Sequence, residues 1–287
     1  MRLISEPTLE RKIVFLDCVN SISVDETKHR LLEAEADIMI RYTDYKEKAT
    51  ASELYLLPSS EWGNEEQIVI SAVSKKDLTS LYTKYFAGEG SVGRSYYDSL
   101  KVLAPLGKCP YCGFGQVSTL DHFLAKSRYP THAILPWNLV PSCSDCNKGK
   151  GSSILTHESQ GMHPYFESNR VEIDSWLRAR VCDTAPVTVE YWIDYPPLWP
   201  NELHRRLKNH FEYLNLGPRF AVEAATEIAG LITTLDEMPD NEDKQAHLAT
   251  VARRERKTRP NTWKAALYDG LKDDNWYIGG GYSRAAT

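Results

Sequence analysis

Four of the six cysteines fall into two close pairs, Cys109/Cys112 and Cys143/Cys146. Two residues separate the members of each pair, and 30 residues separate the pairs. Zn²⁺ prefers four thiolates in a tetrahedron, and two such turns can supply them. In a long chain this spacing indicates a metal site rather than two disulfides. We therefore expect one structural Zn²⁺. Because a four-cysteine site is closed, any reaction must use other residues.

Side chains suited to phosphodiester hydrolysis lie in and beside this interval: Asp121, His122, Asn138, Asn147 and Lys150. A histidine can take a proton from water near neutral pH. A carboxylate and an amide oxygen can hold a hard divalent ion, Mg²⁺ or Mn²⁺, which stabilises charge on the phosphate oxygens. A lysine adds positive charge. The residue types therefore favour a metal-dependent nuclease.

The order of these residues resembles the HNH endonuclease family, which has a ββα-metal core. The matching pattern covers about 45 of the 287 residues and reads CxxC, Asp-His, Asn-Leu-Val and CxxC-Asn-x-x-Lys. The resemblance implies that His122 is the general base and that Asp121 and Asn147 are ligands of the catalytic ion. It also implies that Asn138 braces the loop that carries the base.

Three further segments, LDHFLAKSRYP (120–130), PWNLVPSC (136–143) and HPYF (163–166), are similar to HNH proteins of bacterial anti-phage defence, of the Septu type. That resemblance implies a protein partner, an ATPase of the same operon. Two alternatives stay open. The site could be a degenerate, zinc-stabilised module that binds nucleic acid or protein, or it could belong to an RNase that uses the same residues. The filled chemical positions favour the nuclease.

The net charge of −5 gives the chain little bulk attraction for DNA, so contacts with DNA must be local or shared with a partner. Lys126, Arg128 and Lys148 flank the motif and are candidates for phosphate contacts. Aromatic residues of the C-terminal helices either form a docking face or pack that region's own core: Trp199, Tyr213, Trp263 and Tyr268. With no signal peptide and no membrane span, we expect a cytoplasmic protein without membrane contact.

The sequence patterns around these residues predict an α+β, mostly helical fold in three regions. Residues 1–104 are expected to be mostly helical, with helices over 28–45, 77–86 and 94–103, whereas 67–73 fits a strand or a helix start. Residues 105–155 form the zinc-bound ββα core, where a strand over 117–123 projects Asp121 and His122 to opposite sides. Residues 156–287 contain a strand over 187–193, four helices and a mobile tail.

Overall fold

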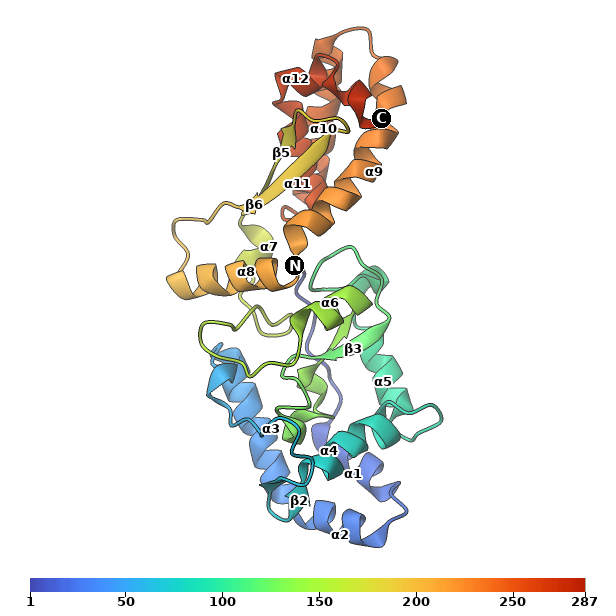
Figure 1. The fold of residues 1–287 in the computed structure, drawn as a ribbon, viewed down its shortest axis with the longest axis vertical. Helices are drawn as coiled ribbons and strands as arrows, with labels where there is room; N and C mark the ends of the chain where they lie inside the picture. Colours follow the sequence, from blue (N-terminus) through green and yellow to red (C-terminus); the bar gives the residue numbers. More distant parts are fainter. Residues whose placement is uncertain (287) are drawn as a thin grey trace. The chain divides into compact units, whose positions relative to one another are not determined.

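The computed structural model describes residues 1–286 and has two compact units, residues 2–167 and the residues from Ser168 onward with Met1 (Figure 1). The first unit contains the expected N-terminal region, the zinc core and residues 156–167. The fold is α+β and mostly helical, as predicted, and its described strands form small two-stranded antiparallel sheets.

Helices make up most of the first unit: α1 (Arg11–Asn20), α2 (Asp25–Glu33), α3 (Glu35–Thr50), η1 (Leu54–Leu56), α4 (Lys75–Ser80), α5 (Arg94–Lys101), η3 (Pro105–Gly107) and α6 (Ser144–Lys150). The prediction of a single helix over 28–45 is wrong, because the helix is interrupted at Ala34, between α2 and α3. Val24 is the N-cap of α2, and Asp25 is the first residue of the helix.

The undecided segment 67–73 forms a hairpin of β1 (Ile68–Ile70) and β2 (Val73–Ser74). Ser74 then begins α4 through a capping box with Asp77. The helix expected over 77–86 is α-helical only to Ser80, and from Leu81 to Phe86 it is a π-helix, η2 (Leu81–Phe86). A π-helix widens the turn by one residue and is frequent at functional sites.

The central hairpin pairs β3 (Thr119–His122) with β4 (Leu139–Ser142), so that Asp121 faces Val140 and His122 faces Leu139. The predicted strand is confirmed in position but is shorter than 117–123. Two short 3₁₀ turns, η4 (Pro130–His132) and η5 (Pro136–Asn138), lie in the connection. Both α5 and α6 pack against this hairpin, and α6 begins directly after β4.

The second unit pairs β5 (Leu177–Cys182) with β6 (Thr188–Ile193). Buried Leu177, Val189 and Tyr191 show that one face of the hairpin contributes to the core, and α9 and α11 pack against its strands. The strand predicted over 187–193 is confirmed, whereas β5 was not predicted. The helices are α7 (Arg170–Ile173), α8 (Asn201–Tyr213), α9 (Leu216–Asp236), α10 (Asn241–Thr258), α11 (Trp263–Lys272), α12 (Asn275–Ile278) and η6 (Gly281–Ala286).

One expectation for this unit is corrected, and one open alternative is decided for two residues. The tail was expected to be mobile, but its described part forms η6, where buried Tyr282 donates a hydrogen bond to Asp236. Trp199 and Tyr268 are buried in the unit's own core and donate hydrogen bonds to Asp174 and Glu227. For these two of the four aromatic residues, the structure supports packing within the unit's own core. None of the helices in residues 1–286 combines the length and apolar character needed to cross a bilayer.

Candidate metal centre and polar site

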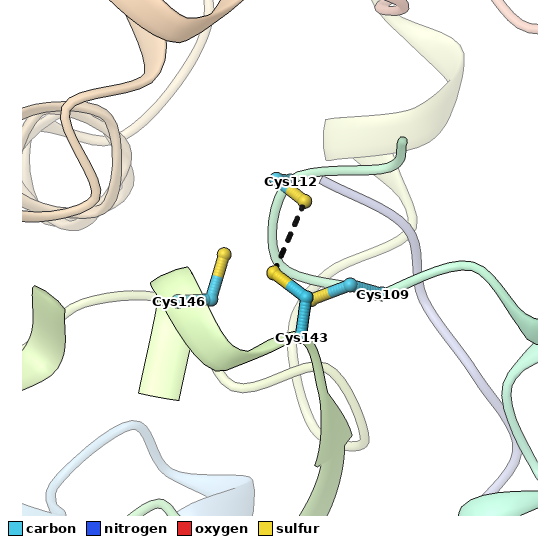
Figure 2. Close-up of side chains that lie close together, drawn as sticks. All are labelled: Cys109, Cys112, Cys143 and Cys146. Carbon is cyan, nitrogen blue, oxygen red and sulfur yellow. Dashed lines mark hydrogen bonds between the residues drawn. The ribbon is translucent and has the colours of Figure 1, made fainter. Parts of the chain in front are cut away.

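The four cysteines of the two pairs meet in a buried cluster within the first unit (Figure 2). One ligand atom from each lies within 4.8 Å of every other, and the Sγ atoms of Cys112 and Cys143 are 3.9 Å apart. With Zn–S bonds of about 2.3 Å, a tetrahedron places its sulfur atoms about 3.8 Å apart. The donor set and spacing therefore fit one structural Zn²⁺, as the sequence predicted.

Local backbone geometry explains why the first cysteine pair forms a tight knuckle. Gly113 has a φ of +82°, a conformation that other residues rarely adopt. A Cβ on Gly115 would lie 2.9 Å from the Cys143 Sγ, so only glycine leaves room for the sulfur atoms. The Gly115 amide also donates a hydrogen bond of 3.3 Å to Cys112 Sγ. On the second pair, Cys143 is the N-cap of α6 and Cys146 lies in its first turn.

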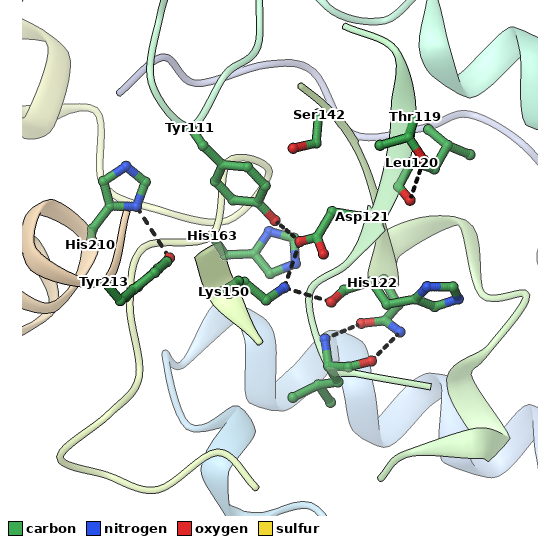
Figure 3. A network of polar contacts seen from close by, with 12 residues as sticks. Tyr111, Thr119, Leu120, Asp121, His122, Ser142, Lys150, His163, His210 and Tyr213 are labelled. Carbon is green, nitrogen blue, oxygen red and sulfur yellow. Dashed lines mark hydrogen bonds and ion pairs between the residues drawn. The ribbon is translucent and has the colours of Figure 1, made fainter. Parts of the chain in front are cut away.

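Asp121 is almost completely buried, with 4% of its surface exposed, and two donors hold it. The Tyr111 hydroxyl and the Lys150 ammonium donate hydrogen bonds of 2.8 Å and 2.6 Å to its Oδ2 atom (Figure 3). Lys150 also donates to the carbonyl oxygen of His122, at 2.5 Å. Burial raises the pKa of Asp121, while Lys150 and Tyr111 act in the opposite direction. Burial lowers the pKa of Lys150, and Asp121 opposes that change.

The cysteine cluster positions both of the donors that hold Asp121. Tyr111 lies between Cys109 and Cys112, and Lys150 is the last residue of the helix that contains Cys146. The meeting of the two turns therefore brings the Tyr111 hydroxyl and the Lys150 ammonium toward the end of β3. This link between the metal centre and Asp121 depends on Tyr111, which the sequence reasoning missed.

His122 extends to the other side of β3 from Asp121, as expected for consecutive residues of a strand (Figure 3). Its Nε2 atom lies 2.8 Å from the carbonyl oxygen of Ala133, which can only accept a hydrogen bond. Nε2 therefore carries the proton, and Nδ1 is the basic nitrogen of the neutral ring. Burial lowers the pKa of His122 to about 3, so the ring is neutral at pH 7.

The ring of His122 also meets an aromatic residue of η2. The ring of Tyr82 contacts it edge to face, with centroids 4.3 Å apart. The ammonium of Lys126 lies 4.8 Å from the centroid of the same tyrosine ring. The π-helix thus places one aromatic ring between the histidine and a lysine of the segment that follows β3.

Asn138 is fully buried and joins the two ends of the segment between β3 and β4. Its Oδ1 accepts from the Leu124 amide (2.7 Å), and its Nδ2 donates to the carbonyl oxygens of Leu124 and His132 (3.0 Å each). Since His122 lies two residues before Leu124 and Ala133 directly follows His132, the Asn138 side chain fixes the backbone near both partners of the His122–Ala133 hydrogen bond.

Two buried residues extend this network. The Tyr45 hydroxyl lies 3.1 Å from Asn138 Oδ1 and 3.0 Å from His163 Nε2. His163 Nδ1 accepts from the amide of Tyr165, so Nε2 carries the proton and donates to Tyr45, which can then donate to Asn138. His163 is thus a packing and hydrogen-bonding residue.

Apart from Asn147, the predicted site residues fall into three local groups. The four cysteines come together, and Lys150 meets Asp121. His122 and Asn138 lie on the other side of β3 or in the adjoining segment. Asn147 is half-buried on α6, one turn before Lys150. Within residues 1–286, the cysteines are the one group of three or more His, Cys, Asp or Glu side chains that lies close enough to hold an ion.

No family model matches the chain, and no solved structure matches it. The chain is similar to protein ea31 of Escherichia phage lambda, with 28% identity over 229 residues, which cover 74% of this chain and 77% of ea31. This similarity indicates distant homology. The name of the phage protein states no activity.

Proposed function

We propose that the protein is a metal-dependent HNH-type endonuclease that hydrolyses DNA phosphodiester bonds. One observation carries the proposal. Strands β3 and β4 lead directly into α6, and this strand–strand–helix unit joins Asp121 and His122 at the end of β3 to the helix that bears Asn147 and Lys150. The cysteine cluster at the base of the same unit supports it.

In this proposal, His122 acts as the general base through Nδ1. Its Nε2–H donates to Ala133, which fixes the tautomer and aims the free nitrogen away from that carbonyl. Burial makes the free imidazole a weak base. The negative charge of a bound phosphate would favour the protonated form and raise its pKa during proton transfer. Asn138 and Tyr82 keep the ring in place.

The oxygen donors of Asp121 and Asn147, on β3 and α6, are of the kind that Mg²⁺ or Mn²⁺ prefers. When bound, such an ion would supply charge stabilisation to the attacked phosphate and the leaving oxygen. Lys150 now neutralises the Asp121 carboxylate. It would therefore exchange its position with the ion or share the carboxylate with it.

The test is cleavage of supercoiled plasmid by the zinc-loaded chain, with Mg²⁺ or Mn²⁺ and in their absence. His122→Ala is compared with a matched control, His29→Ala, because the His29 side chain is 74% exposed on α2. We expect cleavage that requires the added ion and that is lost in His122→Ala alone. Equal cleavage by all three proteins, after removal of contaminating nucleases, contradicts the proposal. A parallel arm with single-stranded RNA distinguishes an RNase.

One observation favours a second candidate, a zinc-stabilised binding module without catalysis. The Asp121 carboxylate already has a cation and a hydroxyl as partners, as in a purely structural buried ion pair. Retention of nucleic-acid or protein binding without ion-dependent cleavage would support this alternative.

A role in anti-phage defence and a partner ATPase remain proposals that rest on the resemblance of short segments. The phage relative shows that similar proteins also occur in a viral genome. Because the chain is acidic, we expect weak cleavage by the isolated chain and stronger cleavage with the protein encoded beside its gene. Strong cleavage by the chain alone, unchanged by that protein, would contradict the partner proposal.

A further inference from the structure

An exposed tryptophan lies beside the segment that follows His122. Trp62 belongs to the loop between η1 and β1, and 65% of its surface is exposed. The loop is anchored after this residue by the Lys76 amide, which donates to the carbonyl oxygen of Glu65 (2.9 Å), and directly before it by two further hydrogen bonds. The Ser60 amide donates to the carbonyl oxygen of Arg128 (2.7 Å), and the ammonium of buried Lys75 donates to that of Glu61 (2.6 Å). Trp62 is therefore exposed on a fixed backbone.

Two cations lie along the surface that connects Trp62 to His122. The guanidinium carbon of Arg128 is 5.9 Å from the centroid of the Trp62 ring. Two residues earlier, the ammonium of Lys126 lies over the ring of Tyr82, which contacts His122. Contacts thus link the proposed base through Tyr82 to Lys126, and Arg128, two residues further along the chain, contacts Trp62.

Neither cation has an ion pair within 4 Å in the part of the chain that the structure describes. Lys75 and Lys76 differ in this respect, because each forms an ion pair: Lys75 lies 3.9 Å from Glu65, and Lys76 lies 3.2 Å from Glu66. Lys126 is also half-buried, and burial lowers its pKa although Glu65 opposes this. A partly desolvated ammonium without a bound anion is a favourable position for a phosphate.

A comparable pair in the second unit shows what is unusual here. Arg180 lies 5.9 Å from the centroid of Trp192, which is 40% exposed. However, Arg180 forms an ion pair with Glu190, so its charge is already neutralised. The Trp62–Arg128 pair has the same separation, but its cation is not neutralised by an ion pair.

We propose that Trp62, Arg128 and Lys126 form a binding surface for an unpaired stretch of nucleic acid beside His122. One base stacks on the open face of Trp62, and neighbouring phosphates bind Arg128 and Lys126. Stacking on an aromatic ring requires a base released from its pair, so the surface selects single-stranded or locally melted substrate over intact duplex. This inference deepens the proposed nuclease function and rests on it for the role of His122.

The test measures the affinity of labelled oligonucleotides by fluorescence anisotropy. The zinc-loaded full chain carries His122→Ala, and no Mg²⁺ or Mn²⁺ is added, so that cleavage does not interfere. The ligands are a short single strand, its blunt duplex, a duplex with a central bubble and the matching RNA strand. Variants at Trp62, Arg128 and Lys126 are compared with Trp192→Ala as the matched control.

We expect the single strand and the bubble to bind more tightly than the blunt duplex. Loss of one stacked base typically weakens binding about 5- to 150-fold, so we expect that loss in Trp62→Ala and no change in Trp192→Ala. Lys126→Gln and Arg128→Gln should each lower the slope of log affinity against log salt concentration by about 0.7. Tight Trp62-dependent binding of the RNA strand would support the surface and identify RNA as its ligand.

Two results would overturn the inference: affinities in Trp62→Ala equal to those of Trp192→Ala, or tighter binding of the blunt duplex than of the single strand. The binding surface and the nuclease proposal can be contradicted independently of each other. If binding depends on Trp62 but the chain with His122 restored shows no ion-dependent cleavage, the nuclease proposal is contradicted and the binding surface is supported. Ion-dependent cleavage with Trp62-independent binding defeats the surface and leaves the nuclease.

Discussion

Replacing Lys150 by methionine tests whether Asp121 can hold a divalent ion. The substitution keeps an unbranched side chain, one atom shorter, and removes its charge. It leaves a carboxylate that is 4% exposed without its cation, although the Tyr111 hydroxyl still donates to it. Removal of one partner of a buried ion pair typically costs about 3–5 kcal/mol. Because the Tyr111 donor remains, we expect the free energy of unfolding to fall by about 3 kcal/mol, the lower end of this range.

A divalent ion should restore part of this loss if Asp121 is a ligand. Binding to the folded state alone stabilises it by about 1.4 kcal/mol at a free ion concentration ten times the dissociation constant. In wild type, the ion must compete with the Lys150 ammonium, which lies 2.6 Å from the carboxylate oxygen. The gain should therefore appear at lower ion concentrations in Lys150→Met than in wild type.

The pH dependence gives a second signature of the same substitution. Burial raises the pKa of Asp121, and loss of Lys150 removes the largest opposing influence. A carboxyl whose folded pKa lies above its unfolded value of about 3.9 favours the folded state at low pH and loses that contribution as pH rises through the folded pKa. The difference in the free energy of unfolding between wild type and the less stable Lys150→Met should therefore grow as pH rises from about 4 to 7.

The assay is urea unfolding of the zinc-loaded proteins at several concentrations of Mg²⁺ or Mn²⁺, with ionic strength held constant by NaCl. The double variant Asp121→Asn/Lys150→Met is the control, since it lacks the carboxylate and should not respond to the ion. A response of Lys150→Met no larger than that of the double variant would refute the assignment of Asp121 as an ion ligand.

Further expectations concern the metal, the Asn138 brace and the buried His163. The purified protein should contain about one zinc per chain by elemental analysis, and Cys143→Ser should lose the metal and stability; a folded, zinc-free wild type would contradict this. Asn138→Ala breaks four buried hydrogen bonds, so urea unfolding should show a loss of about 2–4 kcal/mol, and a loss below about 1 kcal/mol would argue against a brace. Burial holds the pKa of His163 well below 6.5, so its contribution to stability is present above about pH 6.5 and is lost as pH falls. Wild type should therefore lose about 2 kcal/mol more than His163→Phe between pH 7 and 5, and parallel pH profiles would contradict this.

The sequence predicted the parts of the site that depend on short-range spacing. Two CxxC turns can meet around one ion whatever surrounds them. The placement of Asp121 and His122 on opposite sides of β3 follows from the alternation of side chains along a strand. The same alternation was available in Leu177-Arg178-Ala179-Arg180-Val181, where β5 was not predicted. Periodicity also did not reveal the break at Ala34 or the change to a π-helix at Leu81, because apolar spacing barely differs there.

The missed contacts join segments that are distant in sequence. Tyr82 reaches His122 from η2, and Tyr45 reaches Asn138 from α3. Neither tyrosine belongs to a motif, so only packing reveals them. Tyr111 is the exception. It lies inside the first cysteine pair, and its position between two metal ligands was a signal that a buried hydroxyl would be held near the centre.

Chemical rescue of a cavity at position 122 tests the proposed base most directly. His122→Gly leaves a space between Tyr82 and the Ala133 carbonyl, where free imidazole can replace the lost ring. We predict that the zinc-loaded variant cleaves plasmid about 10²–10⁴ times more slowly than wild type with Mg²⁺ or Mn²⁺, and that added imidazole increases the rate. Cleavage by His122→Gly at the wild-type rate, without imidazole, would contradict the assignment of His122 as the base.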